Sequence, residues 1–398
     1  SPNDVRSEFY AYFYPLVFGG GQLSMVVTAL LAYHYDWKYM YYFMMILLLI
    51  AILAVIVFFR HDRPSRKISV SELHLREMLI VSTSLLMLIY VITYGKTLDW
   101  MASPRICFYI AIAPLLLAIF IWEQFHANKP YVSLKPLFQW KAILGYFYMM
   151  LIMFFSTSTS LLTSYLTTIL KVDSTHSYTL YIWLLPGYIV GAVICFWWFR
   201  WQRWRFRFLI AGGMSCFAFF FGALYFGISP DSTYEMLYLP LFLRGLGMLT
   251  LIIAFALFAV EALPPKYLLS NAFFLITFRS VLTPVIAAAF YNNALYRLQQ
   301  RYMVQLSENI TATDPLSASR YASTLSSSLA QGHGIDEAGQ LATNTLYSIL
   351  QQQSTLLALK HILGWLFAIT LVIAIVSRFI PFHKTVRVPV IHTGEDMV

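Results

Sequence analysis

The chain has 398 residues, of which 59% are hydrophobic and only 11% are charged. Ordinary soluble domains carry about a quarter of their residues as Asp, Glu, Lys and Arg, so this composition excludes a soluble globular protein. The formal net charge of +9 would suit a nucleic-acid binder. The basic residues, however, lie in loops between long apolar runs, so we expect a membrane protein with no nucleic-acid partner.

Ten apolar stretches are long enough to cross a bilayer, which takes about 20 residues of helix. The predicted crossings are 8–33, 37–59, 77–95, 105–122, 142–170, 177–199, 206–228, 236–260, 268–291 and 358–381. A β-barrel would show short alternating segments instead. The predicted fold class is therefore all-α, a polytopic membrane protein whose helices form a bundle.

The distribution of Lys and Arg predicts the orientation of the chain. If residue 1 lies in the cytoplasm, most of the basic residues fall in cytoplasmic loops, as the positive-inside rule requires. This orientation predicts an inner (plasma) membrane protein with both ends of the chain in the cytoplasm and the long loop 297–357 outside. That loop is predicted to form two or three polar helices, at 291–307, 316–331 and 336–353, before the last crossing at 358–381.

A row of hydroxyl groups runs along the fifth predicted crossing. Ser156, Ser160, Thr163 and Thr167 share one face at helical spacing, and Tyr148 extends that face inward. One interpretation is a polar wall of a water-filled substrate cavity. The other is close helix packing, in which each hydroxyl bonds back to its own helix.

Two arginines lie inside predicted crossings, Arg244 in the eighth and Arg279 in the ninth. Charges at that depth are costly and normally face a cavity or a partner. Arg244 is thus a candidate cavity residue, and Arg279 is a candidate for coupling or gating. Glu261, at the cytoplasmic end of its helix, is a further coupling candidate. The alternative for both arginines is structural, as a cap for carbonyl groups or a link between helices.

Two other patterns bear on function. Gly19, Gly20 and Gly21 lie in the first crossing with no following Lys, which predicts close helix approach and a gating role rather than phosphate binding. The five phenylalanines of the seventh crossing are predicted to face lipid: Phe217, Phe219, Phe220, Phe221 and Phe226. The sequence contains no Walker loop, nucleophile elbow or helical pair of metal-binding histidines, so we expect no enzyme, metal or cofactor.

Several short motifs occur in an order and spacing that resemble one known family. They are Ser1-Pro-Asn-Asp-Val-Arg6, Trp37-Lys-Tyr-Met-Tyr-Tyr-Phe43, Leu184-Leu-Pro-Gly187, Leu243-Arg-Gly-Leu-Gly247, Asn271 with Arg279, and Gln351-Gln-Gln353 after the long outer loop. Together they resemble the fourteen-helix drug:proton antiporters (EmrB/QacA type) of the major facilitator superfamily.

The resemblance implies an N-terminally truncated chain that holds ten of a probable fourteen transmembrane helices. Residues 1–60 would then be the last two helices of an N-terminal six-helix half, and 61–141 two linker helices with their cytoplasmic links. Residues 142–398 would be the C-terminal six-helix half. In this fold the first and fourth helices of that half, 142–170 and 236–260, line the central cavity, which would bring the hydroxyl stripe and Arg244 together.

The implied function is multidrug-type efflux, the secondary active export of amphipathic, cationic or neutral organic compounds driven by an ion gradient, most naturally of protons. Two alternatives stay open: export of a specific siderophore, lipid or metabolite, and a membrane-embedded enzyme or sensor without transport. The expected partners are the lipid bilayer and a small-molecule substrate. The resemblance adds a periplasmic adaptor and an outer-membrane channel as further candidates.

Overall fold

The computed structural model describes residues 2–58, 74–127, 130–173, 179–201, 206–261, 267–308, 310 and 314–380. Within these ranges the regular elements are all helical, and ten helices are long and apolar enough to cross a membrane. Each of them coincides with one of the crossings predicted above. The all-α prediction is therefore confirmed for the described part of the chain.

The helices follow one another with short connections. Their bounds are α1 Pro2–His34, α2 Trp37–Phe58, α3 Leu75–Tyr94, α4 Pro104–His126, α5 Trp140–Ser156, α6 Thr159–Ser164, α8 Leu184–Trp201, α9 Phe206–Gly227, α10 Tyr238–Glu261, α11 Leu268–Ile276, α12 Thr283–Ser307, α13 Pro315–Ala330 and α14 Ile335–Phe379. Two stretches of π-helix interrupt this pattern, Tyr165–Ile169 after α6 and Thr277–Leu282 between α11 and α12.

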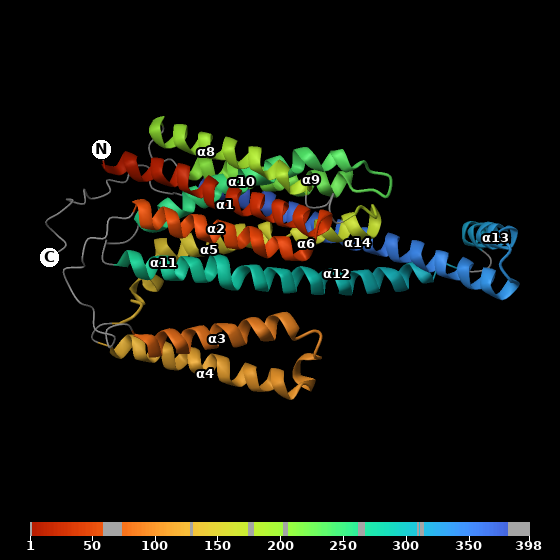
Figure 1. Cartoon of the computed structure of the whole chain (residues 1–398), viewed down its shortest axis with the longest axis horizontal. Helices are drawn as coiled ribbons and strands as arrows, with labels where there is room; N and C mark the ends of the chain where they lie inside the picture. The colour runs from red at the N-terminus through yellow and green to blue at the C-terminus, as the bar shows by residue number, and fades with distance from the viewer. Residues whose placement is uncertain are drawn as a thin grey trace.

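The helices form one main bundle with a two-helix hairpin beside it. In Figure 1 the long helices of the bundle run nearly parallel, and α3 and α4 lie together as a hairpin on the side of α12. Inside the hairpin the buried Ser84 hydroxyl donates to the carbonyl oxygen of Ala113 at 2.7 Å. Near one end of the hairpin, Arg76 forms an ion pair with Glu123 at 2.7 Å.

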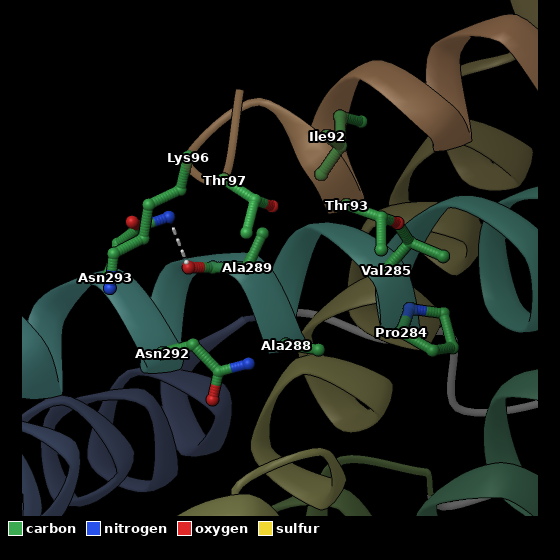
Figure 2. A pocket seen from close by; sticks show the side chains of 10 residues that line it. All are labelled: Ile92, Thr93, Lys96, Thr97, Pro284, Val285, Ala288, Ala289, Asn292 and Asn293. Atoms are coloured by element: carbon green, nitrogen blue, oxygen red, sulfur yellow. Dashed lines mark hydrogen bonds between the residues drawn. The ribbon is translucent and has the colours of Figure 1, made fainter. Parts of the chain in front are cut away.

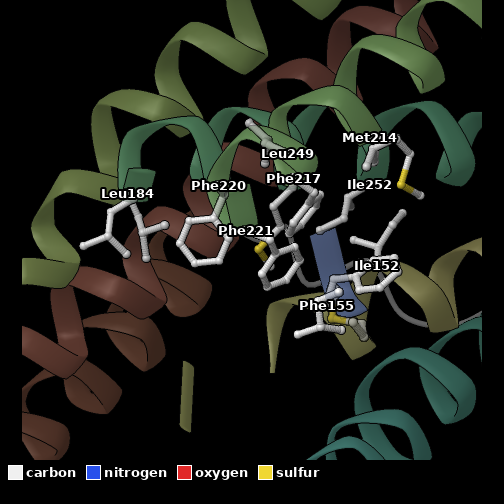
Figure 3. Close-up of a cluster of buried hydrophobic side chains, with 14 of the residues drawn as sticks. Ile152, Phe155, Leu184, Met214, Phe217, Phe220, Phe221, Leu249 and Ile252 are labelled. Carbon is white, nitrogen blue, oxygen red and sulfur yellow. The ribbon is translucent and has the colours of Figure 1, made fainter. Parts of the chain in front are cut away.

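The core of the bundle surrounds α10, whose residues from Leu249 to Phe255 are nearly all inaccessible. Figure 3 shows Phe217, Phe220 and Phe221 of α9 packed against Leu249 and Ile252 of this helix. The prediction that the α9 phenylalanines face lipid is thus wrong for these three side chains. It holds only for the two exposed ones, Phe219 and Phe226. Apolar side chains suit lipid and protein interior equally, so composition alone does not separate the two faces of a membrane helix.

The long polar loop differs from the prediction in its continuity. Its first predicted helix is the end of α12, and its last is the beginning of α14, a single helix of 45 residues. At 1.5 Å per residue α14 is about 68 Å long, more than twice the ~30 Å of a bilayer core. The predicted boundary near residue 357 marks a change of polarity, and no proline or glycine there interrupts the backbone hydrogen bonds.

The remaining loop helix, α13, packs on the outer part of α14. Asp314 caps its start, because its carboxylate accepts from the backbone N–H of Ser317 at 3.0 Å. The turn between α13 and α14 contains Gly332 at φ +91°, a left-handed conformation that glycine adopts without strain. The helices α12, α13 and α14 therefore form one projection from the bundle, visible at the right of Figure 1.

Candidate functional site

Arg244 of α10 is the buried charge around which the candidate site is built, with only 4% of its surface exposed. Its Nη2 donates to the carbonyl oxygen of Ser156 and, at 2.5 Å, to Oγ1 of Thr159. The guanidinium carbon also lies 5.5 Å from the centroid of the Phe220 ring. The arginine therefore connects α10 to the region where α5 ends and α6 begins.

A break in the fifth crossing makes this connection possible. In a regular α-helix the N–H of Ser160 would bond to the carbonyl of Ser156. Here it donates to the carbonyl of Thr157 at 3.3 Å, which leaves the Ser156 oxygen available to Arg244. The Thr159 hydroxyl donates to the same Ser156 oxygen at 3.0 Å. Consecutive Ser and Thr side chains compete with the backbone for hydrogen bonds, so the regular α-helical hydrogen bonding is interrupted within the hydroxyl-rich run.

The hydrogen bonds around Arg244 are incomplete. Among the described residues, its Nε and Nη1 have no hydrogen-bond partner, and neither do the buried hydroxyls of Ser156 and Ser158. A buried cation with unused donors is costly in an apolar surrounding. Arg244 is therefore a buried cation whose hydrogen-bonding capacity is only partly used by the described residues.

The structure brings together only part of the predicted hydroxyl stripe. Ser160 and Thr167 bond back to carbonyls of their own helix. Thr163 does the same and also lies 3.3 Å from the hydroxyl of Tyr181. Thr163 and Thr167 are exposed on that face. This part of the stripe is therefore accessible, whereas Ser156 at its other end is buried in contact with Arg244.

Tyr148 lies away from this contact. Its ring stacks on Phe255 of α10 with centroids 4.5 Å apart, and its hydroxyl is 3.4 Å from that of Ser377 in α14. Sequence reasoning missed Thr159, the side chain that Arg244 does contact. Its signal was its place inside the hydroxyl run, one helical turn before Thr163.

The second intramembrane arginine has a different environment. Arg279 sits in the π-helical turn Thr277–Leu282 and is half-buried. Its Nε donates to the hydroxyl of Ser280 at 3.3 Å, and its guanidinium carbon lies 5.8 Å from the ring of Phe18 in α1. It therefore faces the first helix of the chain, next to the glycine triplet. Glu261 ends α10, and its side chain lies outside the described residues.

The glycine triplet only partly meets its prediction. A Cβ on Gly19 would touch Leu185 of α8 at 3.5 Å, an ordinary contact, whereas Gly20 and Gly21 have nothing within 4 Å of that position. The expectation of close helix approach is thus wrong for Gly20 and Gly21. The close approach occurs instead between α8 and α10, where a Cβ on Gly187 would lie 3.1 Å from the Cα of Gly245.

Comparison with known families decides the class of the protein. The model of the Major Facilitator Superfamily matches residues 1–288, which cover most of the ten crossings. The chain belongs to the major facilitator superfamily. No curated protein matches the chain. The protein is thus a multi-pass membrane protein of a superfamily of secondary transporters, whose members are transporters rather than enzymes.

Proposed function

We propose that this major facilitator protein exports amphipathic organic compounds in exchange for an ion, the proton being the first candidate. The observation that carries this proposal is Arg244, a buried cation with unused donors at the junction of α5, α6 and α10. A charge held at such depth suits a site that a ligand or a partner carboxylate occupies in part of the transport cycle. The hydroxyl of Thr159 accepts from Arg244, and Ser160 and Thr163 continue the hydroxyl stripe away from it.

The same proposal assigns the helices to the two halves of a fourteen-helix transporter. Helices α1 and α2 would be the last two of an N-terminal half, α3 and α4 the linker hairpin, and α5 to α14 the C-terminal half. Two observations support this division. The hairpin stands beside the bundle (Figure 1), and none of the residues of α2 is buried, although a helix of a complete half packs on several neighbours.

Transport would follow from rocking the two halves about the central site. Arg244 is anchored to the α5–α6 junction, so it moves with the C-terminal half. Arg279 lies against Phe18 of α1, which would belong to the N-terminal half. Contacts between the two halves change during alternating access. This gives Arg279 and the neighbouring Gly19 their proposed gating role.

Two other functions compete with multidrug efflux. Export of one specific siderophore, lipid or metabolite would use the same fold and the same arginine with a narrower pocket. A sensor or membrane-embedded enzyme would keep the fold without net transport. We also propose that the projection of α12, α13 and α14 lies outside the inner membrane, where a periplasmic adaptor and an outer-membrane channel could engage it.

A dye-efflux assay with the intact protein in a pump-deficient host tests the proposal. We expect lower accumulation of several amphipathic dyes than in an empty-vector strain, and we expect a protonophore to remove the difference. Arg244→Gln should abolish the efflux at normal membrane abundance, whereas Arg105→Gln, at an exposed arginine of α4, should leave it unchanged. Accumulation equal to that of the empty vector for the whole panel would reject multidrug export.

A further inference from the structure

A groove lies between the hairpin of α3 and α4 and the main bundle. It lies between the end of α3 and the first half of α12 and has a volume of about 600 Å³. Figure 2 shows Lys96 and Asn293 at one end of the groove and Pro284 with Val285 at the other. Nothing in the proposed transport mechanism uses this space.

The hairpin contacts the bundle along α12 and also at its opposite end. There Val81 of α3 and Phe120 of α4 belong to an apolar cluster with Tyr146 and Phe274. Toward the groove, α12 presents the small side chains of Ala288 and Ala289, which leave space that a larger residue would fill. The groove is therefore a space left between α3 and α12 by these small side chains.

The chemistry of the groove changes along its length. Pro284, Val285 and the alanines make one end apolar, and Asn292 and Asn293 make the other end polar. The distance along the helix from Pro284 to Asn293 is nine residues, about 14 Å at 1.5 Å per residue. Since α3 ends at Tyr94, the polar end lies where this crossing leaves the membrane and the apolar end lies deeper.

Positive charge gathers at the polar end. Lys96 lies just beyond α3, with its ammonium nitrogen 3.6 Å from the centroid of the Tyr296 ring. Arg297 is one helical turn beyond Asn293 on the same face of α12 and is exposed. Of the described residues that line the groove, none is acidic. An apolar slot that ends in cations at the membrane surface is complementary to a lipid with an acidic headgroup. Its apolar part suits an acyl chain, and its cations attract the headgroup.

We propose that this groove binds a phospholipid with an anionic headgroup. The phosphate lies between Lys96 and Arg297, and one acyl chain follows Ala289 and Val285 into the membrane. Thr93 and Thr97 line the α3 side of the groove, where their hydroxyls can donate to headgroup oxygens. Because the lipid touches both α3 and α12, it joins the linker hairpin to the bundle, and its loss loosens that attachment.

Native mass spectrometry of the intact transporter tests this proposal with defined lipids. The detergent-purified protein is mixed with phosphatidylglycerol or with phosphatidylcholine of the same acyl chains. We expect the wild type to retain phosphatidylglycerol in preference to phosphatidylcholine. Lys96→Gln and Arg297→Gln should each weaken that preference by about fivefold, the effect of one basic residue beside anionic lipid. Lys96→Arg should keep it.

Two further variants separate a specific site from general charge attraction. Ala288→Trp fills the groove without changing a charge, and it should reduce retention of both lipids. Lys38→Gln removes an exposed lysine at the start of another crossing, α2, and should change nothing. The proposal is overturned if the wild type retains both lipids equally, or if Lys38→Gln acts like Lys96→Gln. It is also overturned if Ala288→Trp, folded by its thermal transition, binds like the wild type.

Discussion

Gly187 of α8 and Gly245 of α10 meet where these two helices cross in close contact. A Cβ on Gly187 would lie 2.3 Å from the carbonyl oxygen of Phe242, and a Cβ on Gly245 would lie 2.5 Å from that of Leu184. Both obstacles are backbone atoms, which cannot move aside as a side-chain end can. Since Arg244 directly precedes Gly245, this crossing also fixes the height of the buried charge.

Gly187→Ala is therefore expected to destabilise the protein. Overpacking of a close-packed core costs about 1–3 kcal/mol, and separation of α8 from α10 would also displace Arg244. We expect a lower thermal transition of the detergent-solubilised protein and reduced transport. Gly212→Ala in α9 is the matched control, because nothing lies within 4 Å of its added Cβ. Equal thermal stability of the two variants would show that the crossing tolerates a methyl group.

Thr159→Val is expected to impair transport more than its position outside the predicted stripe would suggest. The change keeps the size of the side chain and removes the oxygen that accepts from Arg244 at 2.5 Å. A hydrogen bond to a charged group contributes about 1.5–3 kcal/mol, so the arginine should lose its fixed orientation. Thr159→Ser restores the hydroxyl and should restore dye efflux. If Thr159→Val transports like the wild type, the contact is not needed for function.

Tyr146→Phe should lower stability without touching the Arg244 site. The Tyr146 hydroxyl donates to Oδ1 of Asn271 at 2.5 Å in a buried position that joins α5 to α11. Its removal leaves the amide oxygen without this donor, at a cost of about 1–3 kcal/mol. Tyr347→Phe, at an exposed tyrosine of α14, serves as the control. In a thermal double-mutant cycle, Asn271→Leu should make the tyrosine change nearly neutral. A purely additive result would mean that the two side chains do not interact.

The order of α13 should depend on acid pH through its N-cap. Hydrogen bonds from the hydroxyl and backbone N–H of Ser317 lower the pKa of Asp314 below its ordinary value of 3.8. A carboxylate whose pKa is lowered by folding stabilises the folded form above its unfolded pKa, and this contribution disappears as pH falls through the folded value. We expect lower protection against amide exchange across 315–330, relative to the intrinsic rate at each pH, as the pH falls below 3.8. Asp314→Asn keeps a cap that does not titrate, so this pH dependence should vanish.

Cysteine labelling tests the proposed orientation. In a background with Cys107, Cys195 and Cys216 replaced by Ser, a cysteine at Ser326 of the projection should react with an impermeant maleimide from outside. A cysteine at Ser69, which lies between α2 and α3 in the sequence, should react only after the membrane is opened. Protection at Ser326 together with labelling at Ser69 in intact cells would invert the topology.

The ten crossings could be predicted because a segment in lipid must satisfy its backbone hydrogen bonds within its own helix and must carry a long run of apolar side chains. Such runs can be recognised locally in the sequence. The break at Thr157 and the burial of Phe220 beside the exposed Phe219 depend on neighbours distant in the chain. So does the partner of Arg244: depth alone marked the arginine, whereas Thr159 became its acceptor only through the geometry of the broken helix. The continuity of α14 was missed because a change of polarity suggests a boundary where the backbone has none.

That continuity has a mechanical consequence. The inner part of α14 packs against α9 within the bundle, and the same unbroken rod carries α13 at its far end. A stiff rod held near one end turns a small tilt there into a larger sideways swing at its tip. Rocking of the helices inside the membrane would thus produce a larger displacement of α13, on a surface well away from the bilayer.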